Sequence, residues 1–140
     1  MGLSLSAFVS RYDRKSVDYD GYYGAQCVDL ARVWIHNIGG VQFPPLSKGA
    51  KDAFRLAQSQ FWTKVKNSPS NYPPAGAIVV FDAKPGNAFG HIAIARPGCT
   101  KKTLLSFDQN WSLHHACSLE KHNYSSDHVI GWLIKKSAPA

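Results

Sequence analysis

The sequence predicts an α+β domain in which N-terminal helices pack on a C-terminal antiparallel β-sheet. In the first half of the chain, apolar residues recur at the spacings of three and four that are typical of helices. After Phe61 the pattern changes to short runs of strand composition, which clusters of proline and glycine separate. Helices followed by a run of consecutive strands are typical of the α+β class.

Three helices are expected before this change. Residues Leu3–Tyr12 form the first, and Cys27–Ile38 form the second, which Gly39 and Gly40 end. Ser47 is placed to cap a third helix, whose apolar stripe extends to Phe61.

Four later segments have the composition of strands, and turn residues bound them. They are Ala77–Phe81, His91–Ala95, Thr103–Gln109 and Val129–Leu133. Residues Trp62–Lys66 alternate only loosely between polar and apolar positions. We therefore expect the sheet to consist mainly of these four segments.

Size and composition indicate a single globular domain. The chain has 140 residues, of which 44% are hydrophobic and 18% charged, and this composition excludes a disordered or fibrous chain. We expect the folded domain to cover residues 1–136 and to be followed by a tail of linker composition at 137–140.

The net charge of +7 favours a partner that carries negative charge, such as nucleic acid, anionic lipid or an acidic polymer. No basic run is interleaved with aromatic residues, so nucleic acid is not expected. No apolar stretch approaches the roughly 20 residues of a membrane helix, and the N-terminus lacks the pattern of an export signal. We therefore expect neither a membrane partner nor a signal peptide.

Cys27 is the candidate nucleophile. The chain has three cysteines and no CxxC spacing, which excludes a disulfide framework and a zinc ribbon and leaves at least one free thiol. Cys27 stands where a loop enters a helix, and the unpaired N–H groups there favour a thiolate and can hold an oxyanion. The alternative is an inert buried cysteine, against which the polar neighbours Gln26 and Asp29 argue.

His91 begins a predicted strand and is the candidate base. If a hairpin is centred between Cys99 and Thr100, His91 faces Asp108 across the ladder, with Asn110 on the same face. A cysteine–histidine pair needs such a side chain to orient the imidazole. The alternative is a buried histidine with only a structural role.

An acidic loop precedes Cys27 and is a candidate calcium site. Its possible ligands stand at positions one, three, five, seven and twelve of a twelve-residue window, and they are Asp18, Asp20, Tyr22, Gly24 and Asp29. Tyr22 and Gly24 offer only backbone carbonyls, and the loop lacks the glycine and glutamate of an EF-hand. Three close carboxylates repel one another unless a cation or a basic group lies between them. The alternative is a solvated acidic turn.

Five segments taken together resemble the CHAP family, the cysteine, histidine-dependent amidohydrolases/peptidases. They occur in the family's order and are residues 18–30, 74–81, 90–94, 108–111 and 129–132. The resemblance covers about residues 5–135 and implies a papain-like fold. It also implies hydrolysis of an amide bond in bacterial peptidoglycan, as in phage endolysins or virion-associated lysins.

The resemblance assigns a role to each matching residue. Cys27 is the nucleophile, His91 is the general base, and Gln26 joins Cys27 in the oxyanion hole. Asp108 replaces the glutamate that the family commonly has, so the orienting residue is either Asp108 or Asn110, and we favour Asp108. Trp111 follows Asn110 directly and is expected to border the substrate cleft.

Some CHAP lysins bind calcium in the loop before the cysteine, and the resemblance carries that structural ion onto the acidic loop. We expect the chain to act as a monomer on peptidoglycan, with a C-terminal wall-binding domain in the full-length protein. Without a signal peptide, the protein is expected in the host cytoplasm until holin-dependent release, or carried in the virion, before it reaches the cell wall.

Two other readings of the sequence compete with this hydrolase. A zinc-dependent hydrolase would use the cluster His114, His115, Cys117 and His122, but no ordered metal-binding spacing is present, and a solvated loop explains these residues. A non-catalytic module would bind the anionic wall through its charge. Within the hydrolase reading, an endopeptidase and an N-acetylmuramoyl-L-alanine amidase fit equally well.

Overall fold

The computed structural model describes residues 2–21 and 24–136. Three helices come first, and they are α1 (Leu5–Tyr12), α2 (Cys27–Ile38) and α3 (Asp52–Leu56). Six strands follow, and they are β1 (Trp62–Lys66), β2 (Ile78–Phe81), β3 (His91–Ala95), β4 (Leu104–Gln109), β5 (Cys117–His122) and β6 (Val129–Lys135). None of the helices in these residues has the length and apolar character needed to cross a membrane.

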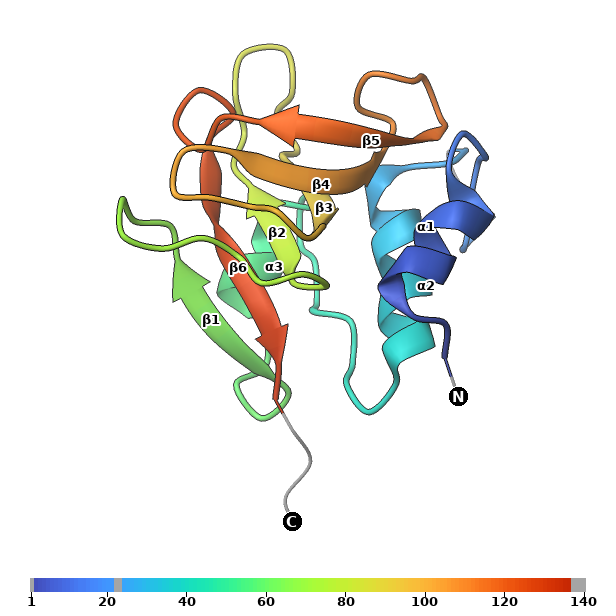
Figure 1. Ribbon diagram of the computed structural model, residues 1–140, viewed down its shortest axis with the longest axis horizontal. Helices are drawn as coiled ribbons and strands as arrows, with labels where there is room; N and C mark the ends of the chain where they lie inside the picture. The colour runs from blue at the N-terminus through green and yellow to red at the C-terminus, as the bar shows by residue number, and fades with distance from the viewer. Residues whose placement is uncertain (1, 22–23, 137–140) are drawn as a thin grey trace.

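The strands form one antiparallel sheet in the order β1-β6-β2-β3-β4-β5. Strands β2 to β5 pair consecutively, whereas β6 returns to lie between β1 and β2. Helices α1 and α2 lie together beside the sheet, and α2 packs on β3 and β4 (Figure 1). The α+β class that the sequence predicts is confirmed.

Strands β2 and β3, at the centre of the sheet, are buried on both faces because their residues alternate between two apolar clusters. One cluster lies between the sheet and the helices, where Ile78 and Val80 of β2 meet Phe8 and Trp34. Neighbouring residues of β2 point the other way, and Val79 belongs to a second cluster. The central strands therefore have no polar face, and β3 is buried along its whole length.

The third helix is much shorter than expected, and Ser47 does not cap it. Instead, Oδ2 of Asp52 accepts hydrogen bonds from the backbone N–H groups of Ser47 at 3.1 Å, Lys48 at 2.6 Å and Gly49 at 3.1 Å. These donors, that of Lys48 first, hold the pKa of Asp52 below its usual value. The turn they form occupies the positions at which the predicted helix would begin.

Two strands were missing from the prediction. Strand β1 pairs with β6, and β5 pairs with β4 at the edge of the sheet. The segment Cys117–His122 is too polar to resemble a strand, but its buried members Ser118 and His122 lie on a polar part of the sheet. Tertiary context therefore determines β5, and strand propensity does not predict it.

Gly90 allows β3 to start close to the end of β2. Its φ is 75°, and a Cβ atom there would collide with the carbonyl oxygen of Phe81 and lie 2.7 Å from the Cβ of Lys51. Gly86, in the same connection, has a φ of 87° but nothing within 4 Å of an added Cβ. Of these two glycines, only Gly90 combines a left-handed backbone with close neighbouring atoms, and it lies directly before His91.

We expect Gly90→Ala to lower the free energy of unfolding more than Gly86→Ala does. Both variants bear the strain of a left-handed alanine, about 1–2 kcal/mol, but only Gly90→Ala adds a steric collision, worth about 1–3 kcal/mol. Urea unfolding followed by tryptophan fluorescence measures the difference. Equal losses in the two variants would show that the close approach at Gly90 does not matter.

Candidate active site

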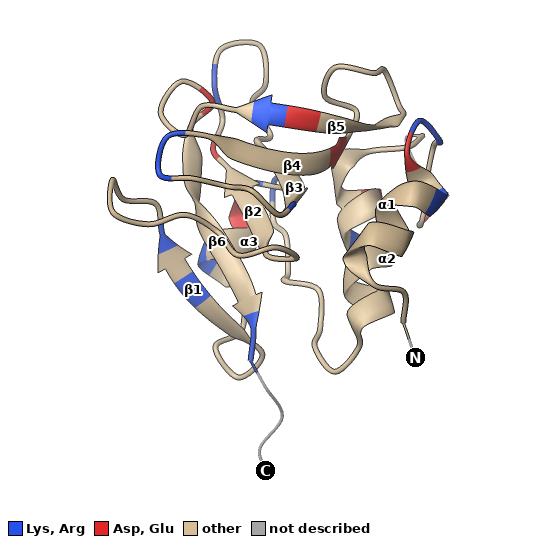
Figure 2. Ribbon diagram, in the orientation of Figure 1, with Lys and Arg blue, Asp and Glu red and all other residues tan. Residues whose placement is uncertain are grey.

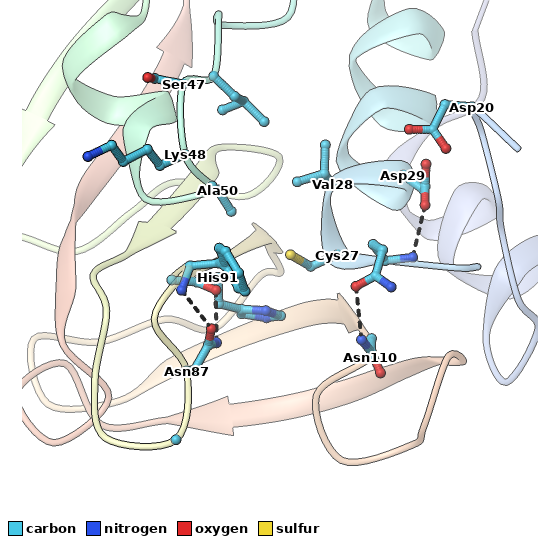
Figure 3. A pocket seen from close by; sticks show the side chains of 16 residues that line it. Asp20, Cys27, Val28, Asp29, Ser47, Lys48, Ala50, Asn87, His91 and Asn110 are labelled. Carbon is cyan, nitrogen blue, oxygen red and sulfur yellow. Dashed lines mark hydrogen bonds between the residues drawn. The ribbon is translucent and has the colours of Figure 1, made fainter. Parts of the chain in front are cut away.

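A cleft of about 980 Å³ separates the start of α2 from the β2–β3 connection. Cys27 lies on one wall and His91 on the other, and their side chains are neighbours (Figure 3). Gln26 and Asn110 also line the cleft. Apolar side chains, among them that of Phe89, complete its walls. The cleft therefore contains a thiol, an imidazole and amide side chains, with both apolar and charged residues in its walls.

Cys27 is the first residue of α2 and is partly exposed. The carboxylate of Asp29 accepts a hydrogen bond from the N–H of Gln26 at 2.9 Å, which fixes the chain just before the helix. The other two cysteines lie elsewhere: the thiol of Cys99 bonds the carbonyl of Arg96 at 3.3 Å, and Cys117 is buried. Of the three thiols, that of Cys27 lines the cleft.

His91 forms a buried pair with Asp108. Nε2 of His91 lies 2.6 Å from Oδ2 of Asp108. The ring nitrogen that remains to face Cys27 across the cleft is therefore Nδ1. The imidazole is thus held between a carboxylate and a thiol, which is the arrangement that general-base activation of a cysteine requires.

The expected strand register is wrong by two residues, although the contact it predicts is present. Ile94 pairs with Phe107 and Ala95 with Ser106, because the turn closes one residue later than expected. Asp108 is therefore a diagonal neighbour of His91 rather than its direct partner. A shift of two residues keeps every side chain on its original face, so the two side chains still meet.

The pKa values of this pair are shifted in opposite directions. Burial lowers the pKa of His91, but the hydrogen bonds and negative charges of Asp108 and Cys27 outweigh it and raise the pKa to about 10. Burial raises the pKa of Asp108, but hydrogen bonds from His122 and His91 outweigh it and lower the pKa to about 2. Asp108 is therefore a carboxylate, and the site favours the protonated imidazole when Cys27 is a thiolate.

The side chain of Asn110 contacts that of Gln26 and not the imidazole of His91. Its amide nitrogen donates to Oε1 of Gln26 at 3.2 Å, and its Oδ1 accepts from the N–H of His115 at 3.1 Å. Its φ is 61°, a left-handed conformation that turns the chain out of β4. Of the two candidates for orienting His91, Asp108 makes the contact, and Asn110 supports the Gln26 side chain.

Gln109 connects the sheet to the start of α2, a role that is not predicted from the sequence. It is fully buried, and its Nε2 donates to the carbonyls of Val17 at 2.7 Å and Gln26 at 2.6 Å. Its Oε1 accepts from the N–H of Val17 at 2.7 Å and from the thiol of Cys117 at 3.3 Å. Every donor and acceptor of the amide is used. No local signal reveals this role, because the partners lie far away in the sequence.

Trp111 is not among the residues that line the cleft, which differs from the expectation. Its ring packs on that of His91 at 4.7 Å between centroids and on that of His122 at 4.6 Å. It therefore covers the histidine from behind. This placement follows from the left-handed turn at Asn110, which directs the next residue back over the sheet.

The four residues of the zinc hypothesis do not meet at one point, although the rings of His114 and His115 lie 3.9 Å apart between centroids. His115 bonds the carbonyl of Ala25 at 2.9 Å, Cys117 bonds Gln109, and His122 bonds Asp108. Among the residues that the structure describes, they do not come together as metal ligands. His122 is instead buried beside the candidate active site, a position that is not predicted from the sequence.

The acidic loop brings three carboxylates together. Asp18, Asp20 and Asp29 each offer an oxygen, and these oxygens lie within 4.8 Å of one another. Burial raises the pKa of Asp29, and the charges of Asp20 and Asp18 raise it further, against a lowering by the N–H of Gln26. Gly24 lies in the same loop with a φ of 73°, next to His115. Tyr22, the remaining expected ligand, lies outside the described residues.

Comparisons with known proteins place this site in a family. A sequence profile described as the CHAP domain matches residues 17–110. Endolysin LysK of Staphylococcus phage K is 31% identical over 97 residues, which are 69% of this chain and 19% of that protein. Endolysin PlyTW of Staphylococcus phage Twort is 33% identical over 98 residues, which are 68% of this chain and 21% of that protein. The chain thus spans about a fifth of the length of these relatives.

Solved structures agree with the sequence comparisons. The wild-type endolysin LysIME-EF1 superimposes with a TM-score of 0.73 and 26% identity, covering 94% of this chain and 64% of that one. Ly7917 superimposes with a TM-score of 0.69 over 94% of this chain and 60% of its own, and its 20% identity supports the fold alone. The expected papain-like α+β fold is confirmed.

The depressed pKa of Asp108 predicts how its contribution to stability depends on pH. A carboxyl group of this kind stabilises the fold above its unfolded pKa of 3.8 and loses that effect as the pH falls toward about 2. Asp108→Asn removes the effect at every pH. We expect the difference in unfolding free energy between wild type and variant to narrow by roughly 2 kcal/mol between pH 6 and pH 2. Chemical denaturation across this range measures it, and a constant difference would contradict the ionised pair.

Proposed function

Since the chain belongs to the CHAP family, we propose that it hydrolyses an amide bond of bacterial peptidoglycan with Cys27 as nucleophile and His91 as base. The observation that carries this proposal is the buried His91–Asp108 pair. Nδ1 of His91, the ring nitrogen that does not bond Asp108, faces Cys27 in the cleft. The relatives are described as endolysins, which supports hydrolysis of the cell wall.

In the first half of the proposed reaction, the thiol of Cys27 transfers its proton to Nδ1 of His91. The thiolate attacks the amide carbonyl carbon, a C–S bond forms, and the carbonyl oxygen becomes an oxyanion. His91 then gives its proton to the nitrogen of the scissile amide, which leaves as an amine when the C–N bond breaks. Asp108 keeps the ring oriented and stabilises its charged form.

The oxyanion forms next to the start of α2. The backbone N–H of Cys27 is one of the helix's unpaired donors, and the amide of Gln26 is the second proposed donor. Asn110 donates to Oε1 of the Gln26 side chain and so orients its amide group. In the second half, His91 takes a proton from water as the water oxygen attacks the thioester carbonyl. The C–S bond then breaks, the carboxylic acid product leaves, and His91 returns the proton to the sulfur of Cys27.

Two peptidoglycan bonds remain candidates for cleavage. An endopeptidase cuts within the stem peptide or cross-bridge, whereas an amidase cuts between muramic acid and L-alanine. Each cleavage leaves a different new terminus, so mass spectrometry of fragments released from purified cell walls distinguishes them.

The positive charge supports binding to an anionic wall. Lys and Arg residues are spread over several elements, including β1 and the end of β6 (Figure 2). We propose that the protein acts as a monomer and that a C-terminal wall-binding domain directs it in the full-length protein. We further propose that it reaches the wall after holin-dependent release or from the virion.

We expect Cys27→Ala to reduce the clearing of a bacterial suspension by roughly a thousandfold or more. The matched control is Cys99→Ala, whose thiol lies outside the cleft. The control should clear at the wild-type rate, and both variants should still sediment with purified walls.

Clearing that survives Cys27→Ala would exclude the cysteine mechanism, and its loss on adding a zinc chelator would then favour the zinc reading. A wild type that sediments with walls but clears nothing would fit a binding module.

We also propose that the acidic loop holds a structural calcium ion. Carboxylates are ligands that Ca²⁺ prefers. The three close oxygens of Asp18, Asp20 and Asp29 repel one another, and a cation between them would remove that repulsion. Backbone carbonyls of Gly24 and of Tyr22 would complete the set. The ion would brace the loop before Cys27 and would not touch the reacting atoms.

Calcium is expected to raise the melting temperature of the wild type, because a ligand present at 100 times its Kd stabilises the folded state by about 2.7 kcal/mol. Asp20→Asn should abolish most of this increase, whereas Asp82→Asn, an exposed acidic residue outside the loop, should leave it intact. Differential scanning calorimetry with Ca²⁺ or a chelator measures the shift. A melting temperature unaffected by millimolar Ca²⁺ would contradict the proposal.

A further inference from the structure

A second buried histidine lies behind the catalytic pair, and the proposed mechanism gives it no role. His122, at the end of β5, places Nε2 at 2.9 Å from Oδ2 of Asp108. Its Nδ1 lies 2.9 Å from Oδ2 of Asp127. Both ring nitrogens thus face carboxylates, in a side chain that is fully buried.

The hydrogen-bonding capacity of the Asp108 carboxylate determines which atom donates in its bond with His122. The ionised carboxylate of Asp108 has only acceptors, so His122 donates to it from Nε2, while Nδ1 of His122 pairs with Oδ2 of Asp127. Asp108 accepts at both oxygens, because the hydroxyl of Ser106 donates to Oδ1 while His91 and His122 share Oδ2. The carboxylate therefore cannot rotate without losing one of these bonds.

Asp127 is in turn held from the other side. Nζ of Lys84 lies 3.5 Å from Oδ1 of Asp127 and 4.5 Å from the centre of the Trp111 ring. The same ring packs on His91 and His122. A closed set of contacts therefore runs from the catalytic histidine through Asp108, His122, Asp127 and Lys84 to the tryptophan and back to the histidine.

We propose that His122, anchored by Asp127, is a positioning residue that holds the Asp108 carboxylate in the orientation that keeps Nδ1 of His91 directed at Cys27. This inference rests on the proposed hydrolase function. A purely structural role for His122 would affect folding but would not affect the His91–Asp108 hydrogen bond selectively.

Two substitutions separate the two hydrogen bonds of His122. His122→Gln places an amide nitrogen near the position of Nε2 and keeps a donor toward Asp108, whereas His122→Asn places it near Nδ1 and keeps the donor toward Asp127. Both remove the ring and both leave an amide in the same buried site. His36→Asn, on the exposed surface of α2, controls for the loss of a histidine elsewhere.

The first measurement is the rate of wall hydrolysis at saturating purified cell walls, taken well below each variant's melting temperature. We expect His122→Asn to lose about 10- to 100-fold in kcat with little change in KM. The conservative His122→Gln should recover most of that loss, although its melting temperature falls as far as that of His122→Asn. Equal losses in the two variants, or full activity in both, would overturn the proposal.

The second measurement does not depend on activity. In ¹H–¹⁵N spectra of the histidine side chains, the Nε2–H signal of His91 should keep its hydrogen-bonded shift in wild type and His122→Gln and lose it in His122→Asn. An unchanged His91 signal in His122→Asn would contradict positioning by His122. If the spectra behave as expected but the wild type hydrolyses no wall, the proposed function fails and the positioning contact stands.

Discussion

The geometry of the candidate site depends on the end of β4, where successive side chains point to opposite faces of the sheet. Asp108 points to one face and holds His91, while Gln109 points to the other and holds the backbone of Val17 and Gln26. One strand end therefore positions both the imidazole and the start of the helix that carries the thiol. Cys27 and His91 are distant in the sequence. Among the described strands, β4 alone contacts both the imidazole of His91 and the backbone just before Cys27.

This arrangement is sensitive because the groups are buried. Gln109 is fully enclosed and has all of its hydrogen-bonding groups paired, so the loss of any partner would leave a buried polar atom unsatisfied, at a cost of about 1–3 kcal/mol. Asp108 is equally enclosed and accepts three hydrogen bonds. Stability and catalytic geometry are thus coupled at this point, since the bonds that hold the core together also aim the reacting side chains.

The sequence predicted those parts of the site that carry a local signal. Cys27 precedes a periodic apolar helix, and His91 opens an apolar strand after a glycine turn, so each stands out from its neighbours. The contact with Asp108 survived a register error of two residues because side-chain direction has a period of two; an error of one would have placed Asp108 on the opposite face. Gln109 and His122 gave no signal, because a polar residue buried by distant partners looks like a solvated one in the sequence. The failure at Ser47 has a similar cause, since a carboxylate several positions later takes the N–H groups that would have started the helix.

Electrostatics connect the acidic loop to the chemistry of the thiol. The start of α2 favours negative charge at Cys27, but Asp29 lies in the first turn of the same helix, and two further carboxylates lie beside it. Burial and the charges of Asp20 and Asp18 raise the pKa of Asp29, and the repulsion among the three carboxylates opposes the folded loop. On the other wall, the negative charge of Asp108 lies behind the imidazole and favours its protonation, which supports the ion pair. A divalent cation in the loop would remove the repulsion among its carboxylates and leave the His91–Asp108 pair unchanged.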